Sequence, residues 1–230
     1  MQFVFEDMTI EKIKKSSHQS IPRQSASLEK RHKSEPMEVD CCGMQIRANT
    51  GVYATSTDSE LMAETVKIFP SENFLEIGCG TGVISISLAK RAKYGVGADI
   101  NSLAVENSKF NAQRYNITNV QFLESNVFEN IQGKFDVIVC NPPYTKNNVS
   151  DNIDRMYWDP NDEMKRTFFR EVGNYLNKNG RIYFGWVNFG DIDVDLPFEL
   201  AEENGYKLQN ISRKPFIGND CDLFVLEFKR

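Results

Sequence analysis

The chain has 230 residues, enough for one globular domain with its own core, and a formal net charge of −5. Hydrophobic residues at 40% and charged residues at 26% are typical of water-soluble proteins, and no apolar run approaches the roughly 18 residues of a membrane span or forms a signal-peptide core. We therefore expect a cytoplasmic protein with no membrane partner. The five cysteines are odd in number and show no paired metal-ligand spacing, so we expect neither a disulfide framework nor a metal.

Residues 1–36 form a basic leader. Between Lys12 and Lys33, seven basic residues accompany Glu29 as the only acid, and such an arm can contact phosphates or an acidic partner. The segment 16–34 is rich in Ser, Gln and Lys without apolar periodicity, which favours a solvated, partly disordered leader, with a helix as the alternative. The only histidines, His18 and His32, lie here and are expected to take no part in catalysis.

Residues 37–50 alternate in polarity around Gly43, which predicts a short β-hairpin. After it, Thr57 and Glu60 have capping-box spacing and predict the start of a helix. Its apolar face is expected to run to Phe69, before Pro70 ends the helix.

Strands and helices then alternate with short connections over a predicted catalytic domain, residues 51–230. Strands are expected at 74–77, 95–100, 120–124, 135–140 and 181–186, and helices at 83–91, 103–115 and 163–176. After a short helix near 197–204, the strands 206–212 and 221–228 follow one another directly and predict an antiparallel pair. This order predicts an α/β protein with a doubly wound, mostly parallel, seven-stranded sheet.

A glycine-rich turn, Gly78-Cys79-Gly80-Thr81-Gly82, follows the first of these strands and opens a helix. Glycines let the backbone turn sharply and let a ligand approach closely. The spacing does not match a dinucleotide site, because Val83 stands where a third glycine is needed. Asp99 ends the next strand, where a carboxylate can accept hydrogen bonds from ribose hydroxyls. A nucleoside ligand without a pyrophosphate fits both features.

Asn141-Pro142-Pro143-Tyr144 directly follows the buried strand 135–140. Two successive prolines fix the backbone direction, so an amide, two carbonyls and an aromatic ring are presented at the end of a core strand. The same four residues are also compatible with an ordinary turn.

The segment 76–82 together with Asp99 resembles the cofactor site of class I S-adenosylmethionine-dependent methyltransferases, which have a Rossmann-like fold. Asn141-Pro142-Pro143-Tyr144 is similar to the motif of the subset that methylates planar nitrogen. Gly51-Val52-Tyr53 with Asp58-Ser59-Glu60-Leu61 further resembles the HemK/PrmC-like branch, whose best-known members methylate a glutamine amide in release factors.

The resemblance implies a set of roles. The cofactor S-adenosylmethionine would contact Glu76, Gly78, Cys79, Gly80, Gly82, Asp99, Ile100, Asn126, Val127 and Asn141. Asn141, Pro142 and Tyr144 would be catalytic, and Pro143, Tyr144, Tyr157 and Trp158 would bind the substrate. Glu76 would brace the glycine turn or reach the methionine amino group. Asn126 stands where the family usually has an Asp beside adenine.

The acceptor is expected to carry a planar nitrogen, because two hydrogen-bond acceptors can localise electron density on it. A glutamine amide of a protein is the main hypothesis. The exocyclic amine of a nucleobase, in RNA or DNA, and a small-molecule amine or amidine are alternatives. A non-catalytic cofactor-binding subunit is an alternative of another class.

Overall fold

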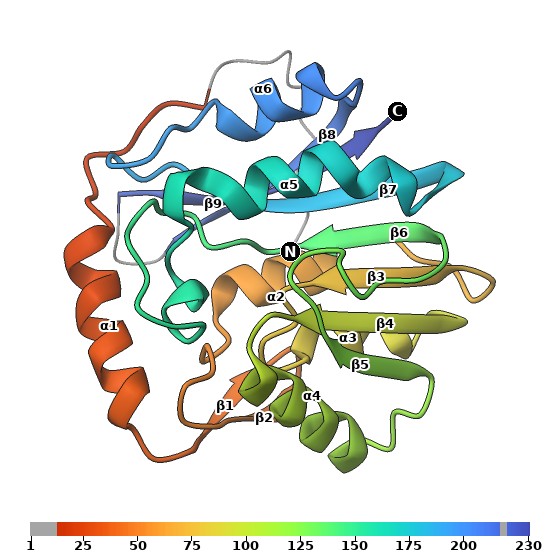
Figure 1. Ribbon diagram of the computed structural model, residues 1–230, viewed down its shortest axis with the longest axis horizontal. Helices are drawn as coiled ribbons and strands as arrows, with labels where there is room; N and C mark the ends of the chain where they lie inside the picture. Colours follow the sequence, from red (N-terminus) through yellow and green to blue (C-terminus); the bar gives the residue numbers. More distant parts are fainter. Residues whose placement is uncertain (1–12, 217–219) are drawn as a thin grey trace.

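The computed structural model describes residues 13–216 and 220–230 (Figure 1). The strands are β1 (Met37–Cys41), β2 (Met44–Ala48), β3 (Asn73–Ile77), β4 (Tyr94–Asp99), β5 (Val120–Glu124), β6 (Phe135–Cys140), β7 (Leu176–Val187), β8 (Lys207–Pro215) and β9 (Asp222–Lys229). The α-helices are α1 (Ile21–Lys33), α2 (Thr57–Thr65), α3 (Val83–Ala89), α4 (Ser102–Arg114), α5 (Glu163–Glu171) and α6 (Leu196–Glu203). Short 3-10 helices are η1 (Asp154–Met156), η2 (Pro160–Asp162) and η3 (Val172–Asn174). Within the described ranges, no helix has the length and apolar character needed to cross a membrane.

Seven strands form one sheet in the order β5-β4-β3-β6-β7-β9-β8. The neighbours from β5 to β7 are parallel, whereas β9 is antiparallel to both β7 and β8. The predicted fold class, including the antiparallel C-terminal pair, is confirmed. From β3 the chain proceeds outward to β4 and β5, and later returns to β6 on the other side of β3. Connections therefore diverge between β3 and β6, and such a switch point opens a crevice beyond the carboxyl ends of the strands.

The centre of the sheet is apolar on both faces. Val137, Ile138, Val139 and Cys140 of β6 have no exposed surface. Right-handed crossovers in opposite directions put α3, after β3, and α5, after β6, on opposite faces of the sheet (Figure 1). Burial on both faces explains why β6 is a continuous β-branched run instead of an alternating one.

The hairpin of β1 and β2 lies outside the main sheet and is tied to α4. Asn107 and Asn111, both fully buried in α4, donate through Nδ2 to the carbonyl of Arg47 at 2.8 and 2.9 Å. Their Oδ1 atoms accept from the backbone N–H groups of Asn49 and Arg47. These polar contacts fix the hairpin without a hydrophobic core of its own.

The leader differs from the expectation of a solvated, partly disordered arm. Residues 21–33 form α1, which stands beside the sheet on the side toward which β3, β4 and β6 point (Figure 1). Arg31, counted among the residues of a basic arm, is buried and donates to the carbonyls of Ala48, Asn49 and Val52. It is therefore a structural residue and does not contact an external phosphate. Lys12 lies outside the described residues.

Three predicted helix boundaries are wrong. Ser56, not Thr57, occupies the N-cap of α2, and no side chain caps this helix. The helix also ends at Thr65, so Phe69 lies outside it and is 58% exposed, with the Arg181 guanidinium over its ring. Leu176, expected at the end of a helix, begins β7 instead.

Candidate functional site

A cavity of about 360 Å³ lies at the carboxyl ends of β3, β4 and β6. Its size falls in the usual range for small-ligand sites, roughly 300–1,000 Å³. The predicted site residues that line it are Glu76, Gly78, Cys79, Gly80, Asp99, Ile100, Asn126, Val127, Asn141, Pro142, Pro143, Tyr144, Tyr157 and Trp158. Gly82 is the one predicted cofactor residue that does not line it, and its contact with the cofactor stays a prediction.

The glycine turn is built on left-handed backbone. Gly78, Gly80 and Gly82 have φ values of 79°, 53° and 81°, which side chains rarely adopt. A Cβ on Gly78 or Gly80 would meet nothing within 4 Å among the described residues, so these two glycines border open space. A Cβ on Gly82 would lie 2.9 Å from the Ser108 Cβ. Gly82 therefore permits the close approach of α4, whereas the other two leave room for a ligand.

Glu76 supports this turn by connecting β3, which precedes it, with α3, which follows it. Its carboxylate is 1% exposed and accepts hydrogen bonds from the Ser85 backbone N–H, at 2.8 Å, and from the Ser85 hydroxyl. Burial raises the pKa of Glu76 to about 8, although the two bonds from Ser85 act in the opposite direction. Of the two expected roles, this geometry favours bracing the turn.

Asp99 connects the glycine turn with the start of α4. Its Oδ2 accepts from the Gly80 N–H at 2.9 Å, and its Oδ1 accepts from the Asn101 N–H at 2.9 Å. Burial raises the pKa of Asp99, while these N–H donors oppose the shift. Each oxygen has a second lone pair, so the carboxylate can still accept from a ligand hydroxyl.

Asn126 follows β5 at the cavity rim, where its exposed side chain donates from Nδ2 to Glu129 Oε1 at 3.1 Å. Val127 next to it is buried with φ at 48°. The positive φ of Val127 changes the direction of the chain at the cavity rim. The sequence did not predict this conformation.

The side chain of Asn141 is held between two partners at the end of β6. Its Nδ2 donates to Asp58 Oδ2 at 3.0 Å, and its Oδ1 accepts from the Tyr144 hydroxyl at 2.7 Å. The Tyr144 ring meets Trp186 and Phe189 edge to face. Burial raises the pKa of Tyr144, and the nearby Asp58 raises it further. Tyr144 is thus a neutral phenol that donates.

Asp58, on α2, was noted in the family resemblance but given no role. Its carboxylate is 8% exposed and also accepts from Ser56 Oγ at 2.8 Å and from the Tyr53 hydroxyl at 3.2 Å. The carboxylate therefore lies at the centre of a hydrogen-bonded group that reaches Asn141. Its place as the first residue of the motif Asp58-Ser59-Glu60-Leu61 was the available signal.

Gly185 of β7 was also missed. A Cβ at this position would lie 2.3 Å from Asn141 Oδ1 and 3.2 Å from Met62 Cε. A glycine inside a central strand is a sequence signal for close approach, here by the Asn141 amide.

Lys165, 1% exposed, supports the two prolines. Its ammonium donates to the Pro143 carbonyl at 3.0 Å and pairs with Asp159 at 2.8 Å and Asp162 at 3.2 Å. A buried charge of this kind is stable only when it is paired and hydrogen-bonded. The arrangement fixes the Pro143 peptide from behind the cavity.

The outer wall of the cavity comes from the segment 145–162 and from α1. Trp158 is buried, and Thr145 and Trp158 form a β-bridge that closes the base of this segment. The Tyr157 ring meets Tyr53 edge to face at 5.6 Å. Gln24 and Ser27 of α1 line the same cavity. The leader is therefore part of the candidate site.

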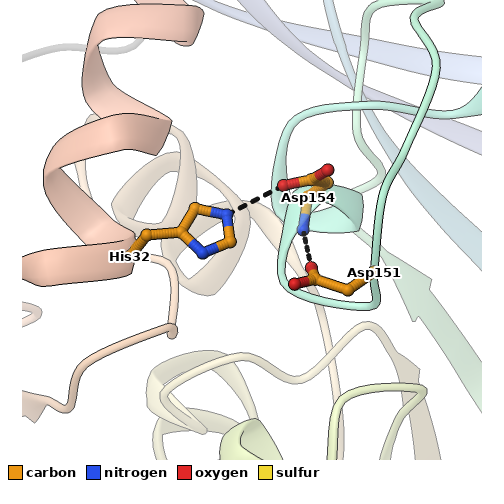
Figure 2. A group of neighbouring side chains, drawn as sticks. All are labelled: His32, Asp151 and Asp154. Carbon is orange, nitrogen blue, oxygen red and sulfur yellow. Dashed lines mark hydrogen bonds and ion pairs between the residues drawn. The ribbon is translucent and has the colours of Figure 1, made fainter.

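The other end of α1 is joined to the segment 145–162 by a side-chain cluster (Figure 2). His32 Nε2 lies 2.9 Å from Asp154 Oδ1, and Asp151 is beside them, with ligand-capable atoms of the three within 4.8 Å of one another. Both carboxylates also accept N–H groups of their own loop, from Ser150 and Ile153. We interpret the cluster as a structural junction, and the absence of a metal remains a prediction.

Comparison with known proteins identifies the family. The sequence profile of the methyltransferase small domain matches residues 43–196. The chain belongs to the methyltransferase small-domain family. This chain is 40% identical, over 151 residues, to a protein of Methanocaldococcus jannaschii that is provisionally named a protein N5-glutamine methyltransferase. The aligned residues cover 63% of this chain and 76% of the relative.

Two further comparisons agree with this assignment. A release factor glutamine methyltransferase of Fusobacterium nucleatum is 28% identical over 199 residues, which cover 77% of this chain and 54% of that relative, so the match spans about half of its length. The crystal structure of a methyltransferase from Pyrococcus furiosus superposes with a TM-score of 0.61 at 19% identity, covering 92% of this chain and 99% of that one. The last comparison supports the fold alone.

The residues of the methyltransferase fit S-adenosylmethionine, the expected donor. Gly78 and Gly80 border open space, and Asp99 presents a carboxylate beside them. Asn126 stands across the rim, and Asn141 lies at the end of the neighbouring strand. This set offers hydrogen-bond acceptors for a nucleoside.

Proposed function

We propose that this methyltransferase moves the methyl group of S-adenosylmethionine to the side-chain amide nitrogen of a glutamine in a protein. The observation that carries the proposal is the position of Asn141, whose amide lines the same cavity as the glycine turn and Asp99. The names of the two relatives point to the same acceptor.

The chemistry requires a nitrogen whose lone pair is available. S-adenosylmethionine supplies an electrophilic methyl group, and as the new carbon–nitrogen bond forms, the carbon–sulfur bond breaks. An amide nitrogen is a poor nucleophile because its lone pair is shared with the carbonyl. Asn141 Oδ1 and the Pro142 carbonyl can accept hydrogen bonds from its two N–H groups and localise density on the nitrogen.

Asp58 and Tyr144 orient this arrangement. Asp58 accepts from Asn141 Nδ2, which directs Oδ1 to the Tyr144 side of the cavity. An entering amide would displace the Tyr144 hydroxyl from Oδ1 and leave the ring free to pack against the acceptor plane. Holding the reactants in line contributes on the order of 7–11 kcal/mol. The methylated nitrogen then releases one of its protons to solvent, which restores the neutral amide.

A small-molecule amine or amidine is the second candidate. It is favoured by one observation: residues of α1 line the cavity, which a compact acceptor can fill. A nucleobase acceptor has less support, since Arg31 of the basic leader is buried in structural contacts.

The proposal can be tested with tritiated S-adenosylmethionine and three acceptor pools: glutamine-containing peptides and proteins, RNA, and small molecules. We expect label in the glutamine pool, base-stable and lost when glutamine is replaced by glutamate. Asn141→Ala should still bind the cofactor in calorimetry and lose nearly all turnover. Label only in RNA or small molecules, or full activity of Asn141→Ala, contradicts the proposal.

A further inference from the structure

The inner face of α1 is polar. Ser20, Gln24, Ser27 and Arg31 recur at intervals of four, three and four residues, which places them on one face of the helix. Ser20, Gln24 and Ser27 line the cavity, and Arg31 is the only buried residue of α1. A helix that covers a protein body usually turns an apolar stripe inward. The polar stripe indicates that α1 faces a ligand instead of a core.

Both ends of α1 are fixed independently of the cavity. At the start, the backbone N–H groups of Ser20 and Ile21 donate to Asp191 Oδ2 at 2.7 and 2.9 Å, and the Ser20 hydroxyl donates to Asp191 Oδ1 at 2.9 Å. At the end, Arg31 Nε donates to the Val52 carbonyl at 2.9 Å. Between these ends, α1 is held beside the cavity by Arg23, which lies 5.1 Å from the centroid of the Phe216 ring.

Two polar atoms of the N-terminal segment lack partners at the cavity. Gln24 Oε1 and His18 Nε2 are buried, and neither has a hydrogen-bond partner within residues 13–216 and 220–230. A buried acceptor without a donor is unfavourable by roughly 1–3 kcal/mol. A ligand N–H at this position would remove that penalty.

We propose that α1 is the acceptor-recognition wall of the enzyme, and that Gln24 Oε1 accepts a main-chain N–H of the peptide that carries the target glutamine. This inference rests on the proposed function. The reacting amide would be held by Asn141 on one side of the cavity, and the peptide main chain would lie against α1 at Gln24. The substrate class is thereby narrowed to amides that carry a second N–H donor next to the reacting group.

The test is a cycle of enzyme and substrate variants. The substrates are a short capped peptide with one glutamine between alanines, and two ester analogues that replace the main-chain N–H of the glutamine or of the following residue by oxygen. The enzymes are the wild type, Gln24→Met, Gln24→Glu and Gln19→Met. Gln19 is exposed beside the same helix and does not line the cavity, so Gln19→Met is the matched control.

We expect one ester analogue to raise the wild-type KM about three- to tenfold, with little change in kcat. Gln24→Met should raise the KM for the peptide by a similar factor, and its KM values for the peptide and for that ester should be equal. Gln24→Glu retains an acceptor oxygen, so its KM should still be higher for that ester than for the peptide. Gln19→Met should behave as the wild type, and cofactor affinity should be equal in all four proteins.

If the ester raises the KM by the same factor in the wild type and in Gln24→Met, the role of Gln24 is overturned, and the proposal of glutamine methylation still stands. Failure of the wild type to methylate the peptide or any glutamine-containing protein would overturn both proposals.

Discussion

The Nδ2 atom of Asn141 donates to Asp58 Oδ2 at 3.0 Å, so a carboxylate on α2 determines which way the amide at the end of β6 faces. An amide has a donor end and an acceptor end of nearly equal shape, and only its hydrogen-bond partners distinguish them. Asp58 therefore orients the Asn141 side chain so that its acceptor oxygen, Oδ1, is the end presented to the cavity.

Asp58→Asn should lower kcat by roughly 10²-fold, because the new amide can place an NH2 group against Asn141 and release its orientation. The KM for S-adenosylmethionine and the melting temperature should change little. The matched control is Glu64→Gln, which neutralises an exposed acid on the same helix and should retain full activity. Steady-state kinetics with both variants check this. Wild-type kcat in Asp58→Asn would show that Asn141 is oriented by other groups.

Gly185→Ala should disturb the same amide from the opposite side. The added methyl group would begin 2.3 Å from Asn141 Oδ1, so the Asn141 side chain must move. We expect a folded protein that binds S-adenosylmethionine normally but has kcat reduced by about 10²-fold, as for a displacement of about 1 Å. Calorimetry and single-turnover assays separate the two effects. A loss of cofactor affinity equal to the loss of turnover would contradict a specific effect on Asn141.

Lys165→Met should destabilise the protein by about 3–5 kcal/mol, because it leaves the buried Asp159 carboxylate without its cation and removes one of the two cations beside Asp162. Lys146 contacts Asp162 from an exposed position, with 57% of its side chain accessible, so Lys146→Met should cost less than about 1 kcal/mol. Urea denaturation of both variants measures the difference. Equal losses of unfolding free energy in the two variants would contradict the importance of burial for the charge of Lys165.

Glu76→Gln should change how stability depends on pH. Since burial raises the folded-state pKa of Glu76 to about 8 from the ordinary 4.5, the folded protein binds more protons than the unfolded chain between these values. The contribution of Glu76 to stability is therefore greatest below about pH 4.5 and is lost as the pH rises toward 8, with a slope of up to about 1.4 kcal/mol per pH unit. The wild-type minus variant difference in unfolding free energy should follow this slope. A difference independent of pH would show that Glu76 is ionised throughout the range.

The sequence predicted the sheet and most of the cavity because both depend on local patterns. The β-branched run of β6 and the glycines after β3 leave few alternatives for backbone conformation, and the crossover rule then brings the strand ends together. The structural reason for Gly82 was not predicted, because it is the close approach of Ser108 of α4, a tertiary contact that spacing alone does not reveal.

The role of α1 could not be predicted from the same patterns. Apolar periodicity marks helices that cover a core, whereas the inner face of α1 carries Ser20, Gln24 and Ser27. The segment therefore has the composition of a disordered arm. Its position is set by Asp191 and by carbonyls of the chain before α2, contacts that are distant in sequence.

The polar attachment of α1 also has a consequence for local stability. With Arg31 as its only buried residue, α1 gains little from apolar burial, and its opening must break a small set of hydrogen bonds at two ends. The free energy of that opening is accordingly well below that of unfolding the sheet. In amide hydrogen exchange, α1 should form a separate unit that exchanges before β3 and β6, and a bound peptide should slow its exchange selectively.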